Sequence, residues 1–577
     1  MSLGVASAMG PPRIASERGP ASDLIAANLA ADMHRLTAPP TRRTASIARN
    51  TAMFSLLTGA SRIMGLVREM LAARYFGTGA PMSAFTLAYA IPSVVRSLFA
   101  DSALSAAFVP TFAATLETGR SREAYRLASS LLLIMLTALG SITALFLVAA
   151  PVVVPALPLG HLASGHLASL AVGLSRVLFP IVLILGLNGL VVGILQAYDH
   201  FSIPAISAVV WNVVIIVVMT AGRSLLSGSN QLYAYAAGIL AGTTVQFAMV
   251  IPMLRRIGFH MTWRTDWRDR RVRRVFSLML PVSLGLGLIN FNGLANSILG
   301  AQVSAQAPSA IDRAFRLYML PQGMFSVAIT TVLFPRLSRL AARRDVEALR
   351  TTCGTGLRLI GVTLLPAAAA TIVLATPITR LVYQGGAFDT ASTQLVSTAL
   401  LWFSFSLPFS GANLLLTRAF FGLQRPWLVM RLSVANLVVN IGVSILLLPL
   451  GIAGIVVGTA VADAAMAAAQ IFALRAELDG RLDLRRTGAA LGRALVATAC
   501  FGVATYGAWA GLERLFDGSV VAQGVAIGGA LGIGAAVYGL VGRWLGLYEV
   551  QRAQAMLAGR LRRTWQRMHR GWVARHR

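Results

Sequence analysis

Long apolar runs separated by short polar breaks dominate the chain from residue 46 onward. A helix needs roughly 20 mostly apolar residues to cross the hydrocarbon core of a bilayer. The recurrence of such runs predicts an all-α integral membrane protein with about 14 transmembrane helices. The predicted spans are 47–75, 82–116, 124–156, 168–198, 203–222, 231–254, 275–300, 311–338, 354–383, 392–421, 427–449, 452–476, 489–512 and 519–546.

Two parts of this pattern repeat each other at a spacing of about 225 residues. Tyr89 and Pro92 of the second span recur as Tyr318 and Pro321 of the eighth. The sequence therefore predicts two pseudo-symmetric six-helix lobes plus two extra helices. The predicted segments are a disordered cytoplasmic N-terminal tail (1–45), an N-lobe (46–256), a basic amphipathic cytoplasmic linker (257–274), a C-lobe (275–478), the two extra helices (479–548) and a basic cytoplasmic tail (549–577).

Composition agrees with a membrane location. Of the 577 residues, 56% are apolar and 12% are charged, whereas soluble proteins average about 45–50% and about 25%. The 50 basic residues, all arginines, exceed the acids by 29. They lie mostly between the apolar runs, where the anionic lipids of a cytoplasmic leaflet are the expected partner, and we expect no nucleic acid.

The distribution of arginine predicts the orientation, because short cytoplasmic connections hold more arginine than translocated ones. Every second connection contains arginine, mostly several, except the short turn 199–201, and the alternate connections contain few, namely Arg223, Arg313, Arg380 and Arg514. We therefore expect both termini in the cytoplasm. In the linker, Trp263 and Trp267 among arginines favour an amphipathic helix on the inner surface, although a solvated basic loop is the alternative.

Several predicted spans contain ionisable side chains. An ionised group at bilayer depth costs about 2.5 to above 10 kcal/mol unless it faces a cavity or a partner. Glu69 follows Arg62 by two helical turns, so one interpretation is an internal salt bridge between the two. The remaining arginines exceed the acids, and their planar guanidinium groups suit phosphate oxygens. We expect a water-filled cavity for an anion, lined by Arg68, Arg96 and Arg316, with Glu69 and Asp101 in support.

The alternative is that these arginines lie near helix ends and extend to the interface, which is our interpretation of Arg74. Amide side chains are expected to support the cavity in the seventh span, at Asn290 and Asn296, or to pack helices together. Asn436, Asn440 and Asp463 offer oxygen ligands for Na⁺ or a proton, and a plain Asp–Asn contact is the other interpretation.

Signatures of enzymes are missing from the sequence. It has no Walker loop, no HExxH and no cluster of histidines with carboxylates. Gly454 and Gly458 form a helix-packing motif within an apolar span. Cys353 and Cys500 have no metal-ligand or disulfide pattern. We expect a protein that is not an enzyme and transports without hydrolysing ATP.

Seven short stretches of the predicted spans carry a family pattern, namely 61–69 (SRIMGLVRE), 76–79 (FGTG), 96–101 (RSLFAD), 107–110 (AFVP), 201–205 (FSIPA), 316–323 (RLYMLPQG) and 333–338 (LFPRLS). In these stretches the chain resembles the MurJ (MviN) family of lipid II flippases, within the MOP exporter superfamily. The resemblance covers about 46–546 and implies a two-lobed transporter whose cavity opens alternately to each side. It also implies that Arg62, Arg68, Arg96 and Arg316 bind the substrate.

Two positions depart from the family pattern. Members often carry Asp where this chain has Ser83, and some carry a carboxylate where it has Phe315. Ser83 is still expected beside the cavity, and the loss of both acids predicts a more positive interior.

The resemblance implies that the chain, as a monomer in the bacterial cytoplasmic (inner) membrane, flips lipid II to the outer leaflet. Lipid II is a polyprenyl-pyrophosphate-linked peptidoglycan precursor, and we expect its tail in a groove near the last two spans. No cofactor is expected beyond Na⁺ or the membrane potential. The alternatives are a flippase for another polyprenyl-linked oligosaccharide, a non-transporting scaffold whose buried arginines are all paired, and two disfavoured classes, a cationic-drug exporter and a glycosyltransferase.

The orientation can be tested by thiol labelling. Cysteines introduced at Gly119 and Ala341 should be protected from an impermeant reagent in intact cells, whereas one at Ser164 should react. Labelling of the first two in unbroken cells would reverse the topology and the direction of transport.

Overall fold

The computed structural model describes residues 42–99, 102–200, 202–262, 266, 268–478, 482–515, 519–552 and 554–555. The chain divides into two units, 1–57 and 58–577, and all contacts below lie within the second. The N-terminal tail through residue 41 and the predicted positions Asp101, Trp263 and Trp267 lie outside the described residues.

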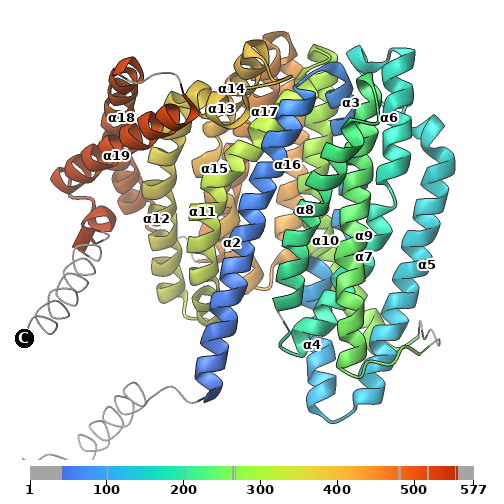
Figure 1. The fold of residues 1–577 in the computed structure, drawn as a ribbon. Helices are drawn as coiled ribbons and strands as arrows, with labels where there is room; N and C mark the ends of the chain where they lie inside the picture. The colour runs from blue at the N-terminus through green and yellow to red at the C-terminus, as the bar shows by residue number, and fades with distance from the viewer. Residues whose placement is uncertain are drawn as a thin grey trace, which may run out of the picture. The chain divides into compact units, whose positions relative to one another are not determined.

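Each predicted span coincides with one helix or with two successive helices (Figure 1). Among the described residues, ten helical segments are long and apolar enough to cross a membrane, or eleven if one bent pair counts as a span. The helices are α2(Arg42–Phe76), α3(Ala80–Phe99), α4(Ser102–Glu117), α5(Ser121–Val153), α6(Gly165–Leu178), α7(Ile181–Ala197), α8(Ser202–Arg223), α9(Gln231–Arg256), α10(Arg270–Val303), α11(Ala307–Ala342), α12(Val346–Val373), α13(Ala375–Tyr383), α14(Thr390–Ser404), α15(Leu407–Gly422), α16(Pro426–Leu446), α17(Ile452–Glu477), α18(Leu484–Leu515) and α19(Val520–Trp544).

Some predicted spans are interrupted. Pro180 stands between α6 and α7, where it lacks the N–H that would continue the first helix. Helices α14 and α15 meet at an angle of 50°, and Pro408 in the first turn of α15 suits the start of a new helix. Irregular backbone inside a membrane is tolerated where protein covers it.

Close packing of α16 on α17 explains the predicted glycine motif. A Cβ atom on Gly454 would lie 1.9 Å from the carbonyl oxygen of Leu447, and one on Gly458 would lie 2.1 Å from Oγ of Ser444. Because only glycine permits this approach, the interpretation of the motif as a packing surface is confirmed.

The two halves exchange reciprocal contacts at one end of the bundle. We call this the arginine-poor end: it is where α2, α8 and α10 finish and α3, α9 and α11 begin. After α13, the N–H of Ala387 donates to the carbonyl oxygen of Arg74 at the end of α2 (2.8 Å). After α5, the carbonyl oxygen of Pro158 accepts from Gln302 at the end of α10 (2.6 Å). Each half thus covers a helix end of the other, as expected of a pseudo-symmetric fold.

The last two helices attach to the C-lobe from outside. Helix α18 packs against α12, and α19 packs against α18; in Figure 1 both lie at the edge of the bundle away from α5. Tyr538 donates to the carbonyl oxygen of Val362 on α12 (2.7 Å), and Arg358 of α12 pairs with Glu549 beyond α19 (2.8 Å).

Two glycines test the reciprocal contacts. Gly386 and Gly119 both have positive φ (+61° and +74°), but a Cβ on Gly386 would lie 2.4 Å from the carbonyl oxygen of Arg74, whereas Gly119 has nothing within 4 Å. Gly119→Ala should therefore cost about 1 kcal/mol from backbone strain alone. Gly386→Ala should cost about 3 kcal/mol, because overpacking adds to the strain. Equal shifts of the thermal unfolding midpoint of the two variants in detergent would contradict the close contact of Gly386 with Arg74 at the arginine-poor end.

Candidate functional site

Three of the charged residues predicted at membrane depth, Arg68, Glu69 and Arg316, meet where α2 passes α11. Oε1 of Glu69 accepts from Nη2 of Arg68 (2.6 Å) and from Nη1 of Arg316 (3.0 Å). Nε of Arg316 also donates to Asp312, one turn earlier on α11 (2.9 Å). Glu69 is only 9% exposed. One carboxylate of the N-lobe is therefore shared between a guanidinium of its own helix and a guanidinium of the C-lobe.

This geometry overturns one interpretation and adds one acid. The interpretation of Glu69 as the partner of Arg62 is wrong, because Arg68 and Arg316 occupy the Glu69 carboxylate. Asp312, which was not identified from the sequence, pairs with Arg316, and its i,i+4 spacing from Arg316 is the signal in the sequence that identifies it.

Arg68 is held on a second side by an aromatic ring. Its guanidinium carbon lies 4.7 Å from the centroid of the Trp211 ring on α8, a cation–π distance. Nε1 of Trp211 donates to the Thr243 hydroxyl on α9 (3.1 Å), which fixes the ring. The position of Arg68 thus depends on α2, α8 and α9 together.

Arg62 has a different environment. It is exposed, and within the described part of the chain it has no ion pair or hydrogen bond. Its Nη1 lies 3.9 Å from where a Cβ on Gly323 of α11 would be. Gly323 follows Arg316 by two turns, so Arg62 lies alongside the same helix, farther from the arginine-poor end. Its guanidinium is open to a ligand.

The four predicted arginines stand at different depths. At 1.5 Å per residue, Arg68 and Arg316 lie about 12 and 14 Å along their helices from the arginine-poor end, Arg62 about 21 Å and Arg96 about 24 Å. Arg96 is half-buried in the last turn of α3. The four arginines therefore form a series of positive charges at increasing distance from the arginine-poor end.

A fully buried arginine was not identified from the sequence. Arg313, assigned there to a connection, lies in α11 and is 1% exposed. Its Nη2 donates to the carbonyl oxygens of Gly77 (3.0 Å) and Ala72 (3.4 Å). Its guanidinium carbon lies 5.6 Å from the ring of Tyr383 and 5.8 Å from that of Phe388. A cation at the carbonyl end of α2 is favourable for the helix dipole, so Arg313 fastens α2 to the C-lobe.

Ser83 belongs to a polar seam between the halves. It is fully buried, and its hydroxyl donates to the hydroxyl of Ser309 (3.1 Å). Ser309 donates to the carbonyl oxygen of Thr78 (2.8 Å), and the Thr78 hydroxyl donates to Ser392 (2.7 Å). The N–H of Ser392 donates to Asp389 before α14, which lowers the pKa of that carboxyl. Hydroxyl groups thus join the lobes beside Arg313.

The residues predicted to hold Na⁺ or a proton fall into two clusters. Asp463 of α17 accepts from Ser406 at the break between α14 and α15 (2.9 Å) and from Asn436 of α16 (3.4 Å). The Ser406 hydroxyl is also 2.7 Å from that of Tyr318 on α11. This cluster has a single acid and neutral hydrogen-bond partners.

Asn440 lies in the second cluster, one turn along α16. It donates to Asn296 (2.9 Å) and to Asn292 of α10, and it accepts from Thr459 of α17 (3.2 Å). Asn290, two residues before Asn292 on α10, is half-buried. Within the described residues, no group of three or more His, Cys, Asp or Glu could hold a metal. Ion coupling through these clusters stays a prediction.

The fold is that of the MOP superfamily of membrane transporters. The chain is similar to an inward-facing multidrug resistance MATE family transporter of that superfamily, with a TM-score of 0.63 and 16% identity over 73% of this chain and 94% of the other. It is also similar to a structure of lipid II flippase MurJ in an inward closed conformation, with a TM-score of 0.70 and 21% identity over 86% and 99%.

Sequence comparison identifies the family. The family model described as lipid II flippase MurJ matches residues 72–525. A probable lipid II flippase MurJ of Treponema pallidum is 27% identical over 71% of this chain and 78% of its own length. The lipid II flippase MurJ of Burkholderia cenocepacia is 29% identical over 61% and 68%. The chain belongs to the MurJ family, and the resemblance noted from its motifs is confirmed.

The shared carboxylate generates a stability prediction. Glu69→Gln leaves Arg68 and Arg316 without their common partner and should lower the free energy of unfolding by about 3 kcal/mol, since breaking a buried pair leaves uncompensated charge. Glu347→Gln is the matched control. Its side chain is 72% exposed in a pair with Arg350, and its loss should cost less than about 1 kcal/mol. Similar shifts of the thermal unfolding midpoint for the two variants would show that Glu69 does not stabilise the contact between α2 and α11.

Proposed function

We propose that the chain flips lipid II from the cytoplasmic to the outer leaflet of the bacterial inner membrane by alternating access. Membership of the MurJ family and the similarity to MOP transporters support this proposal. In this scheme both termini are cytoplasmic, the arginine-rich connections contact anionic phospholipids, and the chain acts as a monomer.

The observation that carries the proposal is the open guanidinium of Arg62 beside the paired Arg68 and Arg316. Three guanidinium groups here face two carboxylates, Glu69 and Asp312. A site with surplus positive charge and planar donors suits a pyrophosphate. A non-transporting scaffold would pair all its arginines, and Arg62 is unpaired within the described part of the chain. Transport is therefore the better supported class.

The geometry suggests how binding is coupled to opening. Phosphate oxygens that reach Arg316 compete with Glu69 for the same guanidinium, because a bidentate phosphate contact occupies the Nη atoms. Losing Arg316 would detach Glu69 of α2 from α11. Substrate binding then weakens the contact that holds the lobes together near the arginine-poor end, as a rocking transporter requires. Arg62 and Arg96 lie farther from the arginine-poor end than Arg316. They would therefore be the first to meet a pyrophosphate that enters from the cytoplasmic side.

Arg62 gives the cleanest test of this function. Arg62→Ala should keep the thermal unfolding midpoint, because no ion pair is broken, and should abolish complementation in cells depleted of the native protein. Losing one charged contact to a buried anion should weaken binding about 10- to 150-fold. Arg62→Lys keeps the charge without the planar fork and should be intermediate.

Arg74→Ala is the matched control, because Arg74 is exposed at the arginine-poor end of the same helix; it should retain function. The lipid-linked intermediate that accumulates on depletion identifies the substrate. Accumulated lipid II supports the proposal, whereas another polyprenyl-linked oligosaccharide would reassign the flippase. Full activity of a stable Arg62→Ala protein would exclude the anion-binding mechanism.

A further inference from the structure

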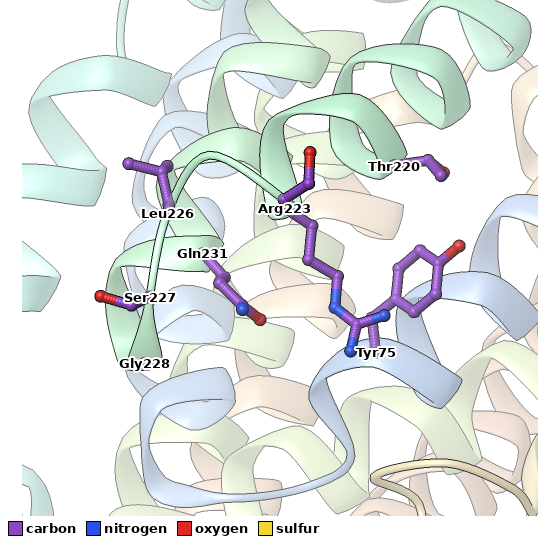
Figure 2. A pocket seen from close by; sticks show the side chains of 8 residues that line it. Tyr75, Thr220, Arg223, Leu226, Ser227, Gly228 and Gln231 are labelled. Atoms are coloured by element: carbon purple, nitrogen blue, oxygen red, sulfur yellow. The ribbon is translucent and has the colours of Figure 1, made fainter.

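A pocket of about 480 Å³ lies at the arginine-poor end, apart from the arginine sites described above. It is formed by the end of α2, the end of α8, the connection to α9 and the first residue of α9 (Figure 2). Its polar lining residues are Tyr75, Thr220, Arg223, Ser224, Ser227 and Gln231, and no lining residue is acidic.

Arg223 is the charged group of this pocket. Its guanidinium carbon lies 4.5 Å from the centroid of the Tyr75 ring, and Figure 2 shows the side chain extending from α8 to that ring. Among the described residues Arg223 has no ion pair. The side chains of Thr220, Ser227 and Gln231 also have no hydrogen bond to the described protein. A cation and these polar side chains therefore line one pocket, and none of them has a protein acceptor among the described residues.

The pocket lies at the expected level of lipid headgroups. Helix α8 has 22 residues, about 33 Å at 1.5 Å per residue, and the hydrocarbon core is about 30 Å thick. Its last turn, with Arg223, thus emerges among the headgroups. Val217 on α8 is 58% exposed and Leu225 beside the pocket is 83% exposed. These apolar side chains suit contact with lipid, so the pocket is accessible sideways from the bilayer.

The shape of the pocket is fixed by close packing of its walls. A Cβ on Gly222 would lie 2.7 Å from that of Ala234 on α9, so α8 and α9 are held tightly together beside Arg223. Gly228 has a φ of +58°, which turns the connection between α8 and α9. An added Cβ there would have nothing within 4 Å, so the space beside this turn is open. The packing of α8 on α9 therefore fixes the backbone from which the exposed side chains of Thr220 and Arg223 extend.

We propose that this pocket binds the phosphate of a membrane lipid in the leaflet opposite the arginine-rich connections. Arg223 supplies the guanidinium fork, Tyr75 holds it in place, and Ser227 and Gln231 donate to the remaining phosphate oxygens. The ligand is either a phospholipid headgroup or the diphosphate of a polyprenyl lipid, since both present the same oxygens. The inference does not depend on the proposed transport activity.

A fluorophore beside the pocket measures binding directly. It is attached to Leu225→Cys in full-length protein with Cys500→Ser; Cys353 is buried. Dihexanoyl phosphatidylglycerol should give a saturable signal, and dihexanoylglycerol, which has the same chains without phosphate, should give none. Arg223→Gln should weaken binding about 10-fold or more. Arg514→Gln, in the exposed last turn of α18 at the same end, should leave it unchanged.

Each outcome decides the proposal. Equal signals from the two dihexanoyl lipids, or unchanged affinity in Arg223→Gln, would overturn it, and Arg223 would then only stabilise the end of α8. If Arg223→Gln does not fold, Arg223→Lys, which keeps the charge at the helix end, should bind more weakly than the parent.

Tighter binding of farnesyl diphosphate than of the phosphatidylglycerol identifies a polyprenyl diphosphate as the source, and the reverse identifies a phospholipid. Equal affinity for inorganic phosphate would show that the lipid part is not recognised and would overturn the proposal.

Discussion

The arrangement of the two lobes depends on the ion pairs that the Glu69 carboxylate makes with two arginines. The carboxylate is buried, belongs to α2 and accepts from Arg68 of its own helix and from Arg316 of α11. In a low-dielectric interior neither the acid nor the arginines are stable alone. The charges therefore require the two helices to remain together, and any ligand that satisfies Arg316 changes that requirement.

Further hydrogen bonds join the lobes beside these three charged groups. Arg313 donates to the carbonyl groups that end α2, the Ser83–Ser309 pair joins positions about 225 residues apart, and the connection after α13 donates to the carbonyl oxygen of Arg74. All of them lie between Glu69 and the arginine-poor end. Arg62 lies on the other side of Glu69, so the guanidinium without an ion pair among the described residues is found where these contacts do not fasten the lobes.

The spans could be predicted because membrane helices leave long apolar runs, which need no knowledge of tertiary contacts. The breaks before Ile181 and Leu407 were not predicted, because the apolar runs continue through them. Only the nearby prolines indicate that a helix ends there. The partners of Glu69 could not be predicted, because Arg316 is 247 residues away and its approach depends on how the lobes pack. Arg313 was missed for the same reason: its carbonyl partners come from the end of α2. Asp312 could have been found from its spacing to Arg316.

The most direct test of the account is the distance between the lobes at the arginine-poor end. Nitroxide labels on Ala163→Cys and Ala391→Cys, both exposed and on opposite lobes, report it by double electron–electron resonance in a Cys500→Ser chain. The account predicts one short distance in the parent protein and an added longer population in Glu69→Gln. Identical distance distributions in the two proteins would show that the shared carboxylate does not hold the lobes together.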